Sequence, residues 1–467
     1  MKSYIFIFFF FALILEINSN LRNLKEEQNT PEPPFAGDEP PEPPPGPGPG
    51  PGPAPSGNNT YNYTDYKAVS IDTYLTSEDT ITSENADESA AYITKSGIKF
   101  EGANLIKESG ESSDIENSEF YGVNAAVLVQ GGELNINGGS ITTKAKGGNA
   151  LCATNHGKVT LTNTVIKSTA ERSARGLHST YGGEIIGTSL TISSTGDSCA
   201  TLATDRGEGT VECTNCKLTT GGKGSPVIYS TGQITISNTE GTATYSQMVV
   251  VEGKNTATVK DSSNLKCHGN GNREENVDIC GVMLYQSMSG DAEDGISTFN
   301  CENSQMEIVS DSEVFKTAPM FFVTNTKSEI NLENCTFAYG SETFLSSKGT
   351  SAWGNTGKNG GEVTLTLKNQ DIEGDLVIDN ISTLELKMIN SKFTGKINNG
   401  KTALKMAITL DADSKITLTG DSYYTSLKNA DSKGNNIDKG NYKFVEYDSS
   451  SQKWIKVSMI LLVLLFL

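Results

Sequence analysis

A regular repeat constrains the fold of this chain more than any other feature of its sequence. Units open at equal intervals along the chain, at Asn124, Asn149, Ala174 and Cys199. Every unit has the same order: a small and aliphatic triplet, a polar or glycine turn, an alternating strand, a second turn and a short Thr/Ser-rich strand. A period in the twenties is typical of a solenoid, in which each repeat stacks on its neighbours.

The alternating strands indicate the kind of solenoid. Each reads polar, aliphatic, polar, aliphatic, and the apolar runs are too short for helices. Because successive side chains of a strand face opposite sides, each coil sends two aliphatic residues inward and two polar residues to water. The sequence therefore predicts an all-β fold, a parallel β-helix. The alternation is clearest at residues 133–136, 158–161, 233–236 and 329–332.

The segments before the repeats predict a secretory protein. Residues 1–20, with an apolar core at 4–15, have the pattern of a signal peptide, and a retained anchor is the alternative. Residues 21–60 are acidic and then Pro/Gly-rich, so we interpret them as a disordered, extended linker. Residues 61–121 are expected to hold the N-terminal cap and the first coils, and 122–447 the parallel β-helix. The expected location is extracellular or at the cell surface.

The C-terminal segment, 448–467, contains a second apolar block. Its final run, VSMILLVLLFL, is short for a membrane span. Small residues, a polar spacer and an apolar tail match the outline of a GPI-attachment signal. A weak tail anchor and a buried terminal strand are the alternatives. The predicted membrane association is therefore through this tail or through a lipid anchor.

Composition limits the class of partner. The net charge is −19 and the pI is about 4.7, which argues against nucleic acid and anionic membrane surfaces as partners. Most of the 15 prolines lie between Pro31 and Pro55. The repeats hold only Pro226 and Pro319, as expected where nearly every N–H group joins a strand ladder.

Cysteines in an oxidising compartment can pair. Cys267 and Cys280 bracket a polar, glycine-rich loop that cannot bury itself, so we predict a disulfide between them, with pairing across coils left open. Cys213 and Cys216 form a CxxC, which we interpret as packing or a local disulfide rather than a zinc or redox site. N-glycosylation is predicted at the asparagines of four sequons: Asn58, Asn62, Asn334 and Asn380.

Six runs of the chain are similar to a known group of proteins. They are GVMLYQSMSGDAEDG at 281–295, ATDRGEGTV at 203–211, SPVIYSTGQITIS at 225–237, VEGKN at 251–255, FFVTNTKSEINLENCTF at 321–337 and GDSYYTSL at 420–427. Together they resemble secreted, adhesin-like, right-handed parallel β-helix proteins of the pectate-lyase-like superfamily, over roughly residues 122–427. The resemblance implies a right-handed β-helix and no particular reaction.

An enzyme of the same fold is the alternative to an adhesin-like protein. The DD, GHG and RxK signatures of pectin hydrolases are absent from the sequence. A lyase needs a carboxylate cluster for calcium and an Arg or Lys base. The nearest approach to one is Asp291 and Asp294 beside Glu293, with Arg206 on another coil. No cofactor is therefore expected, apart from calcium in the lyase alternative.

The function expected from the sequence is binding rather than catalysis. We expect a secreted or cell-surface, adhesin-like β-helix protein that displays its ladders to extracellular glycans or surface proteins. A polysaccharide lyase or hydrolase is the alternative. In the run 281–295 an apolar strand meets a Ser/Gly/Asp-rich outward loop. The predicted binding residues come from this run: Tyr285, Ser287, Asp291 and Asp294.

Overall fold

The structure, a computed structural model, describes residues 61–269 and 279–449. All of them belong to one compact unit, Pro51–Leu467. The predicted signal peptide, the predicted linker and the C-terminal block beyond Ser449 lie outside the described residues. Among the described residues the regular structure is β, apart from one short helix, α2 (Ile115–Tyr121). This confirms the predicted all-β class.

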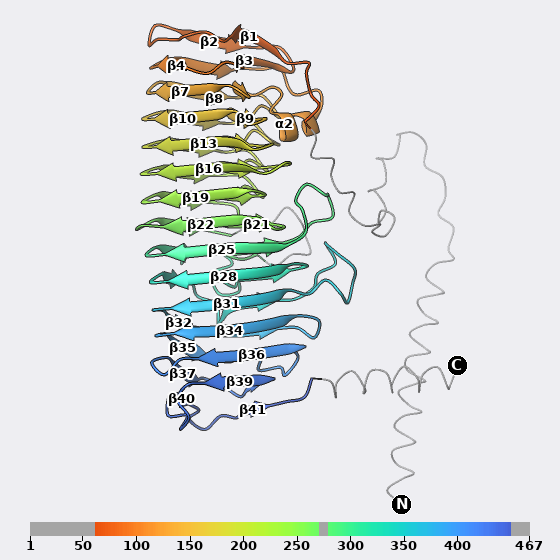
Figure 1. Ribbon diagram of the computed structural model, residues 1–467, viewed down its shortest axis with the longest axis vertical. Coiled ribbons are helices and arrows are strands. Elements are labelled where there is room, and N and C mark those ends of the chain that lie inside the picture. Colours follow the sequence, from red (N-terminus) through yellow and green to blue (C-terminus); the bar gives the residue numbers. More distant parts are fainter. Residues whose placement is uncertain (1–60, 270–278, 450–467) are drawn as a thin grey trace, which may run out of the picture. The chain divides into compact units, whose positions relative to one another are not determined.

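Through most of its coils the described chain visits three long sheets in turn (Figure 1). Neighbouring strands within a sheet come from successive coils, and they pair in parallel. In Figure 1 the coils follow one another in sequence order, from the orange β1 (Lys67–Ile71) to the blue β39 (Ser426–Asn429). The fold is therefore a parallel β-helix, as the repeat predicted.

Two of the long sheets run through nearly all of the coils. Sheet A has 12 strands, in the order β1, β3 (Glu88–Ile93), β6 (Val127–Gln130), β9 (Leu151–Thr154), β12 (Leu177–Ser179), β15 (Leu202–Thr204), β18 (Ile228–Ser230), β21 (Val249–Glu252), β24 (Val282–Tyr285), β27 (Phe321–Thr324), β30 (Thr343–Ser347) and β33 (Asp375–Ile378). Sheet B has 13 strands, in the order β4 (Ile98–Glu101), β7 (Glu133–Asn137), β10 (Lys158–Thr162), β13 (Gly183–Thr188), β16 (Gly209–Thr214), β19 (Gln233–Ser237), β22 (Thr256–Lys260), β25 (Ile296–Glu302), β28 (Lys327–Glu333), β31 (Glu362–Lys368), β34 (Thr383–Ile389), β36 (Lys405–Leu410) and β39.

The third side of the coils is divided between two sheets. Sheet C has 10 strands, in the order β2 (Thr80–Ser83), β5 (Asn104–Lys107), β8 (Ser140–Thr143), β11 (Val165–Ser168), β14 (Thr191–Ser194), β17 (Lys217–Thr220), β20 (Glu240–Ala243), β23 (Asn264–Cys267), β26 (Gln305–Ile308) and β29 (Thr336–Ala338). Sheet D continues with β32 (Asp371–Glu373), β35 (Lys392–Gly395), β37 (Lys415–Leu418) and β40 (Ile437–Asp438). A short pair, β38 (Ser422–Tyr424) and β41 (Phe444–Glu446), lies near the end of the described chain.

The core consists of aliphatic ladders that run from coil to coil. On sheet B, Val159 pairs with Leu134 of the preceding coil and Ile185 of the following one, and all three are buried. Leu161 pairs with Ile136 in the same way. Full burial of each such side chain contributes about 1.5–3 kcal/mol. The predicted alternation of inward aliphatic and outward polar residues is thus confirmed.

Asparagines shape the turn that follows the sheet B strands. Asn215, Asn238, Asn303 and Asn334 have positive φ values, a conformation that asparagine tolerates better than most residues. Their amides bond from coil to coil, with Asn238 Nδ2 donating to Asn215 Oδ1 at 2.7 Å and Asn334 Nδ2 to Asn303 Oδ1 at 3.0 Å. The same turn is therefore repeated in register along the helix.

Coil length changes along the chain as the sequence suggested. Paired residues on sheet B show it, because the difference between their numbers is the length of one coil. In the early coils Lys158 pairs with Glu133. In the later coils Thr383 pairs with Glu362 and with Lys405, so these coils are shorter. The insertions between these two regions leave the coils, and one of them helps to build the groove described below.

Helix α2 was not predicted. Its first turn is capped by Asp114, whose Oδ1 accepts from Glu116 N at 2.9 Å, and it ends at Gly122 with a φ of 72°. The helix lies against the outer face of sheet A, where its Glu119 carbonyl lies 2.7 Å from His178 Nε2. Residues 61–121 thus contain β1 to β5 and a helix that covers part of that face.

Candidate functional site

The outer face of sheet A carries mostly apolar residues at one of its outward positions. One outward position holds, in successive strands, His178, Ala203, Tyr229, Val250, Met283 and Phe322. Tyr229 is half-buried and the others are buried. Segments outside the coils pack on them, including Ala352 and Trp353 from the insertion that follows β30. These covering segments create a concave surface.

A cavity of about 420 Å³ lies on this face. Pockets of roughly 300–1,000 Å³ with a few polar groups on an apolar wall are typical of ligand sites. We call it the sheet A groove and define it by three aromatic rings, four carboxylates and one guanidinium: Tyr229, Tyr285, Trp353, Glu119, Asp205, Glu252, Asp291 and Arg175.

A buried ion pair lies at one side of the groove. Arg175 Nη1 donates to Asp205 Oδ2 at 2.9 Å, and Arg175 Nη2 lies 3.8 Å from Glu119 Oε1. Arg175 and Asp205 are 7% and 5% exposed, so this interaction is shielded from solvent. The pair connects two coils of sheet A, and through Glu119 it also holds α2 in place.

His178 completes this network as a neutral ring. Burial, and then the charge of Arg175, lower the pKa of His178 well below its usual value. His178 Nε2 lies 2.7 Å from the Glu119 carbonyl oxygen, and Arg175 Nη1 lies 3.1 Å from Nε2 and 3.3 Å from Nδ1 of the same ring. His178 therefore positions α2 and Arg175 and adds no charge to the groove.

Asp205 is the carboxylate whose protonation is most altered by its surroundings. Burial raises its pKa to about 7, against the lowering effect of Arg175, and Glu119 and Asp291 raise it further. Close to it, Arg206 Nη2 donates to Asp291 Oδ1 at 2.8 Å, and the Arg206 guanidinium stacks 3.7 Å from the centre of the Phe120 ring. The loop that contains Asp291 is thus tied to α2.

Glu252 lies at the other side of the groove and is 1% exposed. Its Oε2 accepts from Tyr229 Oη at 2.5 Å and from Tyr285 Oη at 2.7 Å, while Oε1 accepts from Ser287 N at 3.3 Å. Burial, and then the Glu252 charge, raise the pKa of Tyr229 well above its usual value, so its hydroxyl stays a donor. The Tyr285 ring lies 4.4 Å from the Trp353 ring, tilted by 46°.

The structure places three of the four predicted binding residues in the wall of the cavity: Tyr285, Ser287 and Asp291. Asp294 is exposed and does not line it. Arg206, which we expected on another coil, forms an ion pair with Asp291. Ligand binding by any of these residues stays a prediction.

Four residues of the groove were not predicted as binding residues from the sequence: Asp205, Glu252, Arg175 and Trp353. A signal for the two carboxylates was present. The residue after the sheet A triplet is Thr154 and Thr180 in the earlier coils, and in the next three coils the same repeat position holds Asp205, Thr231 and Glu252. A charged residue where the repeat has threonine indicates a local change of role. No comparable signal marked Trp353, which lies in an insertion.

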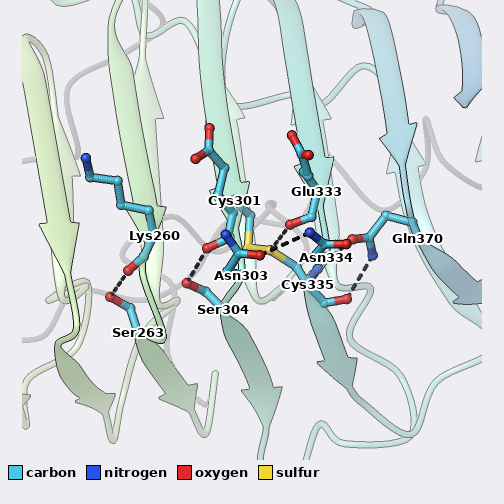
Figure 2. The surroundings of a disulfide bond; sticks show 10 residues. Lys260, Ser263, Cys301, Asn303, Ser304, Glu333, Asn334, Cys335 and Gln370 are labelled. Atoms are coloured by element: carbon cyan, nitrogen blue, oxygen red, sulfur yellow. Dashed lines mark hydrogen bonds between the residues drawn. A yellow bond between two sulfur atoms is a disulfide. The ribbon is translucent and has the colours of Figure 1, made fainter.

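Within residues 61–269 and 279–449 the structure contains one disulfide, and it joins neighbouring coils (Figure 2). Cys301 of β25 bonds to Cys335, which follows β28, with a Cα–Cα distance of 6.4 Å and a sequence separation of 34. Beside it, Gln370 Oε1 accepts from Cys335 N at 2.6 Å and Gln370 Nε2 donates to Cys335 O at 2.8 Å (Figure 2). The bond thus lies across coils, the arrangement that the sequence left open.

The two predicted cysteine pairs are not disulfides in the structure. Cys267 is a buried thiol at an inward position of β23 in the main core. Cys280 packs instead in the cluster on the outer face of sheet A. Cys213 and Cys216 lie close enough for their thiols to hydrogen bond, in line with the packing interpretation of the CxxC.

Three of the predicted glycosylation sites are exposed: Asn62, Asn334 and Asn380. Asn62 Oδ1 accepts from Tyr121 Oη at 2.7 Å, and Asn334 belongs to the turn ladder. Asn58 lies outside the described residues. Modification at all four stays a prediction.

Within 61–269 and 279–449, no group of three or more His, Cys, Asp or Glu side chains is arranged to hold a metal ion. No helix in this part of the chain is long and apolar enough to cross a membrane.

Comparisons of the chain with family models, with curated proteins and with solved structures find no match. The parallel β-helix is established by the strand pairing of the structure. The likeness to the pectate-lyase-like superfamily rests on the six sequence runs alone. Function is therefore inferred from the groove residues themselves.

Proposed function

We propose that this chain is an adhesin-like β-helix protein of the pectate-lyase-like superfamily that binds glycans in the sheet A groove. The observation that carries this proposal is the meeting of Tyr229, Tyr285 and Trp353 with buried carboxylates in one cavity of about 420 Å³. Sugar rings have apolar C–H faces and polar edges. Aromatic side chains pack against such faces, and carboxylates accept hydrogen bonds from hydroxyl groups.

The arrangement of the groove suits a ligand of this kind. Tyr285 and Trp353 form adjacent rings, 4.4 Å between centres, on which a sugar face can rest. Asp205 and Glu252 lie two strands apart in sheet A, which places their Cα atoms about 10 Å from one another at the usual strand spacing. A glycan lying along the groove would meet both carboxylates.

The location we propose is the cell surface or the extracellular space. It rests on the apolar core at residues 4–15 and the GPI-like tail at 448–467. A Pro-rich linker at 21–60 would lie between the signal peptide and the β-helix. The partners we propose are extracellular glycans or glycosylated surface proteins.

A glycan array probed with the secreted full-length chain tests the proposal. Trp353→Ala should weaken binding of any positive glycan about tenfold or more, a loss of about 1.4 kcal/mol. Tyr245→Ala is the matched control, because Tyr245 is an aromatic residue, 51% exposed, that does not line the groove. Absence of binding to every glycan, or equal binding by the Trp353 variant, would contradict glycan binding in the groove.

Glycan hydrolysis in the same groove is a second candidate function. It is favoured by Asp205, whose pKa is raised to about 7 by burial, because a carboxyl group that holds its proton near neutral pH can act as a general acid. Glu252 is then the second carboxylate, and inverting glycosidases separate their two carboxyl groups by roughly 6.5–9.5 Å. The ion pair of Asp205 with Arg175 works against this role.

Release of reducing ends from the glycans that bind separates the two functions. If the chain is a hydrolase, the wild type should release reducing ends, and Asp205→Asn should bind the glycan without releasing them. Binding without any product over long incubation would leave glycan binding as the function and remove hydrolysis.

A further inference from the structure

Glu252 is a buried carboxylate whose hydrogen-bond donors are all neutral. It accepts from two tyrosine hydroxyls and from one backbone N–H. None of the ion pairs within residues 61–269 and 279–449 includes Glu252. Hydrogen bonds lessen the cost of burying a carboxylate, but without a counter-ion much of that cost remains.

The other carboxylates of the groove differ from Glu252 in this respect. Asp205 and Glu119 share Arg175, at 2.9 Å and 3.8 Å, and Asp291 pairs with Arg206 at 2.8 Å. Both guanidinium groups are thus already engaged, at the side of the groove away from Glu252. Among the described residues Glu252 itself has no cationic partner, which favours a ligand that carries a positive charge.

The aromatic rings beside Glu252 also favour a positively charged ligand. The hydroxyls of Tyr229 and Tyr285 bond to its carboxylate, and the Trp353 ring packs 4.4 Å from that of Tyr285. Aromatic faces attract ammonium groups by the cation–π interaction, more strongly where water is excluded. A carboxylate among aromatic rings is a suitable receptor for an ammonium group and a poor one for another carboxylate.

We propose that the sheet A groove selects glycans with protonated, unacylated amino groups, and that Glu252 forms the ion pair with the sugar ammonium. This inference rests on the proposed glycan-binding function and names its ligand class, an amino-sugar polymer. An oligosaccharide of uronic acids would instead bring its carboxylates against Glu252, and like charges brought together in an interface weaken binding strongly.

Titration calorimetry with the full-length chain tests this selectivity. The probes are a β-1,4-linked glucosamine hexamer, its fully N-acetylated counterpart, the neutral glucose hexamer and a galacturonate hexamer. At a pH below the pKa of the sugar amine, the wild type should bind the glucosamine hexamer about tenfold or more tightly than the acetylated one, as expected for one charge-assisted hydrogen bond. Above that pKa, the two should bind alike.

Glu252→Gln keeps the shape of the side chain and an oxygen acceptor, and removes the charge. It should lose the preference for the amine, so that the glucosamine and the acetylated hexamers bind with similar affinity. The matched control is Glu329→Gln, an exposed glutamate on the outer face of sheet B that should change nothing. Circular dichroism and melting of both variants establish that they fold, and the pH dependence of the wild type tests the proposal without any variant.

The outcomes separate the two proposals. Equal binding of the glucosamine and neutral hexamers would overturn the amine selectivity and leave glycan binding intact. A preference that survives in Glu252→Gln would overturn the role of Glu252. Binding of none of the four hexamers would count against both proposals for these glycans, and equally tight binding of an oligolysine peptide would overturn the restriction to sugars.

Discussion

Arg206 and Asp291 are 85 residues apart in the chain, and Arg206 Nη2 lies 2.8 Å from Asp291 Oδ1. Arg206 also stacks on Phe120 of α2 at 3.7 Å. One guanidinium therefore joins the loop after β24 to the helix that covers sheet A. Two segments that lie outside the coils are thus linked on this side of the groove by the Arg206 side chain.

Arg206→Ala should loosen the loop at residues 286–294 more than it destabilises the fold. Both partners are about a quarter exposed, at 27% and 28%, so we expect a loss of less than about 1 kcal/mol in the free energy of unfolding. Hydrogen exchange of residues 287–294 should become faster. Lys217→Ala breaks an exposed pair with Glu240 and serves as the control. Unchanged exchange in the Arg206 variant would mean that this bond does not hold the loop.

The Arg175–Asp205 pair should behave as a buried ion pair. Arg175→Met leaves the Asp205 carboxylate buried beside Glu119 without its cation, and the free energy of unfolding should fall by about 3–5 kcal/mol. The double variant Arg175→Met with Asp205→Leu removes both charges and should recover much of that loss. Urea denaturation of the two variants measures the difference, and a double variant less stable than the single one would contradict this account.

The repeat predicted the fold because the rule that produces it is local. Alternation of side chains determines which residues point inward, and Leu134, Ile136, Val159 and Leu161 follow it. Parallel stacking of equal coils then places residues of the same repeat position on one another. A solenoid therefore needs little information from distant parts of the sequence.

The groove depends on contacts that no repeat encodes. Asp205 and Glu252 occupy an outward position, which on a bare β-helix would be solvated, and they are buried because α2 and the Trp353 insertion cover that face. The disulfide was missed for a related reason. Cys301 and Cys335 are 34 residues apart, which is more than one early coil, such as the one from Glu133 to its paired residue Lys158. The regular repeat of the sequence therefore did not indicate that the two cysteines lie side by side.

The Cys301–Cys335 bond should be detected by peptide mapping under non-reducing conditions as one linked pair of peptides. Cys267 should react with an alkylating reagent after denaturation without reduction, because it is a thiol in the core. Replacing both Cys301 and Cys335 by alanine should cost about 3–4 kcal/mol in the chain-entropy model for a loop of this length. A mapped bond between Cys267 and Cys280 would instead support the pairing predicted from the sequence.

The buried Lys107 should make the free energy of unfolding depend on pH. It is fully buried, and its Nζ donates to Ser83 Oγ at 3.2 Å, to Glu88 O at 2.8 Å and to Asn85 O. Burial lowers its pKa from 10.5 to about 8, against the opposite effect of Glu88 and Asp87. Between these two values the unfolded chain binds more protons than the folded one at this residue. The contribution of Lys107 to stability therefore increases as the pH rises from about 8 to 10.5.

Urea denaturation of the wild type and Lys107→Met across this range tests the sign. The free energy of unfolding of the wild type should rise relative to that of the variant, with a slope no steeper than about 1.4 kcal/mol per pH unit. The variant should also be less stable by about 1–3 kcal/mol, because the carbonyls of Asn85 and Glu88 lose their buried donor. Lys144→Met, which replaces an exposed lysine on the next coil, is the control. Its free energy of unfolding should change with pH as that of the wild type does. Parallel curves for Lys107→Met and the wild type would show that Lys107 does not release its proton in this range, and that its ammonium is stabilised by the three oxygens around it.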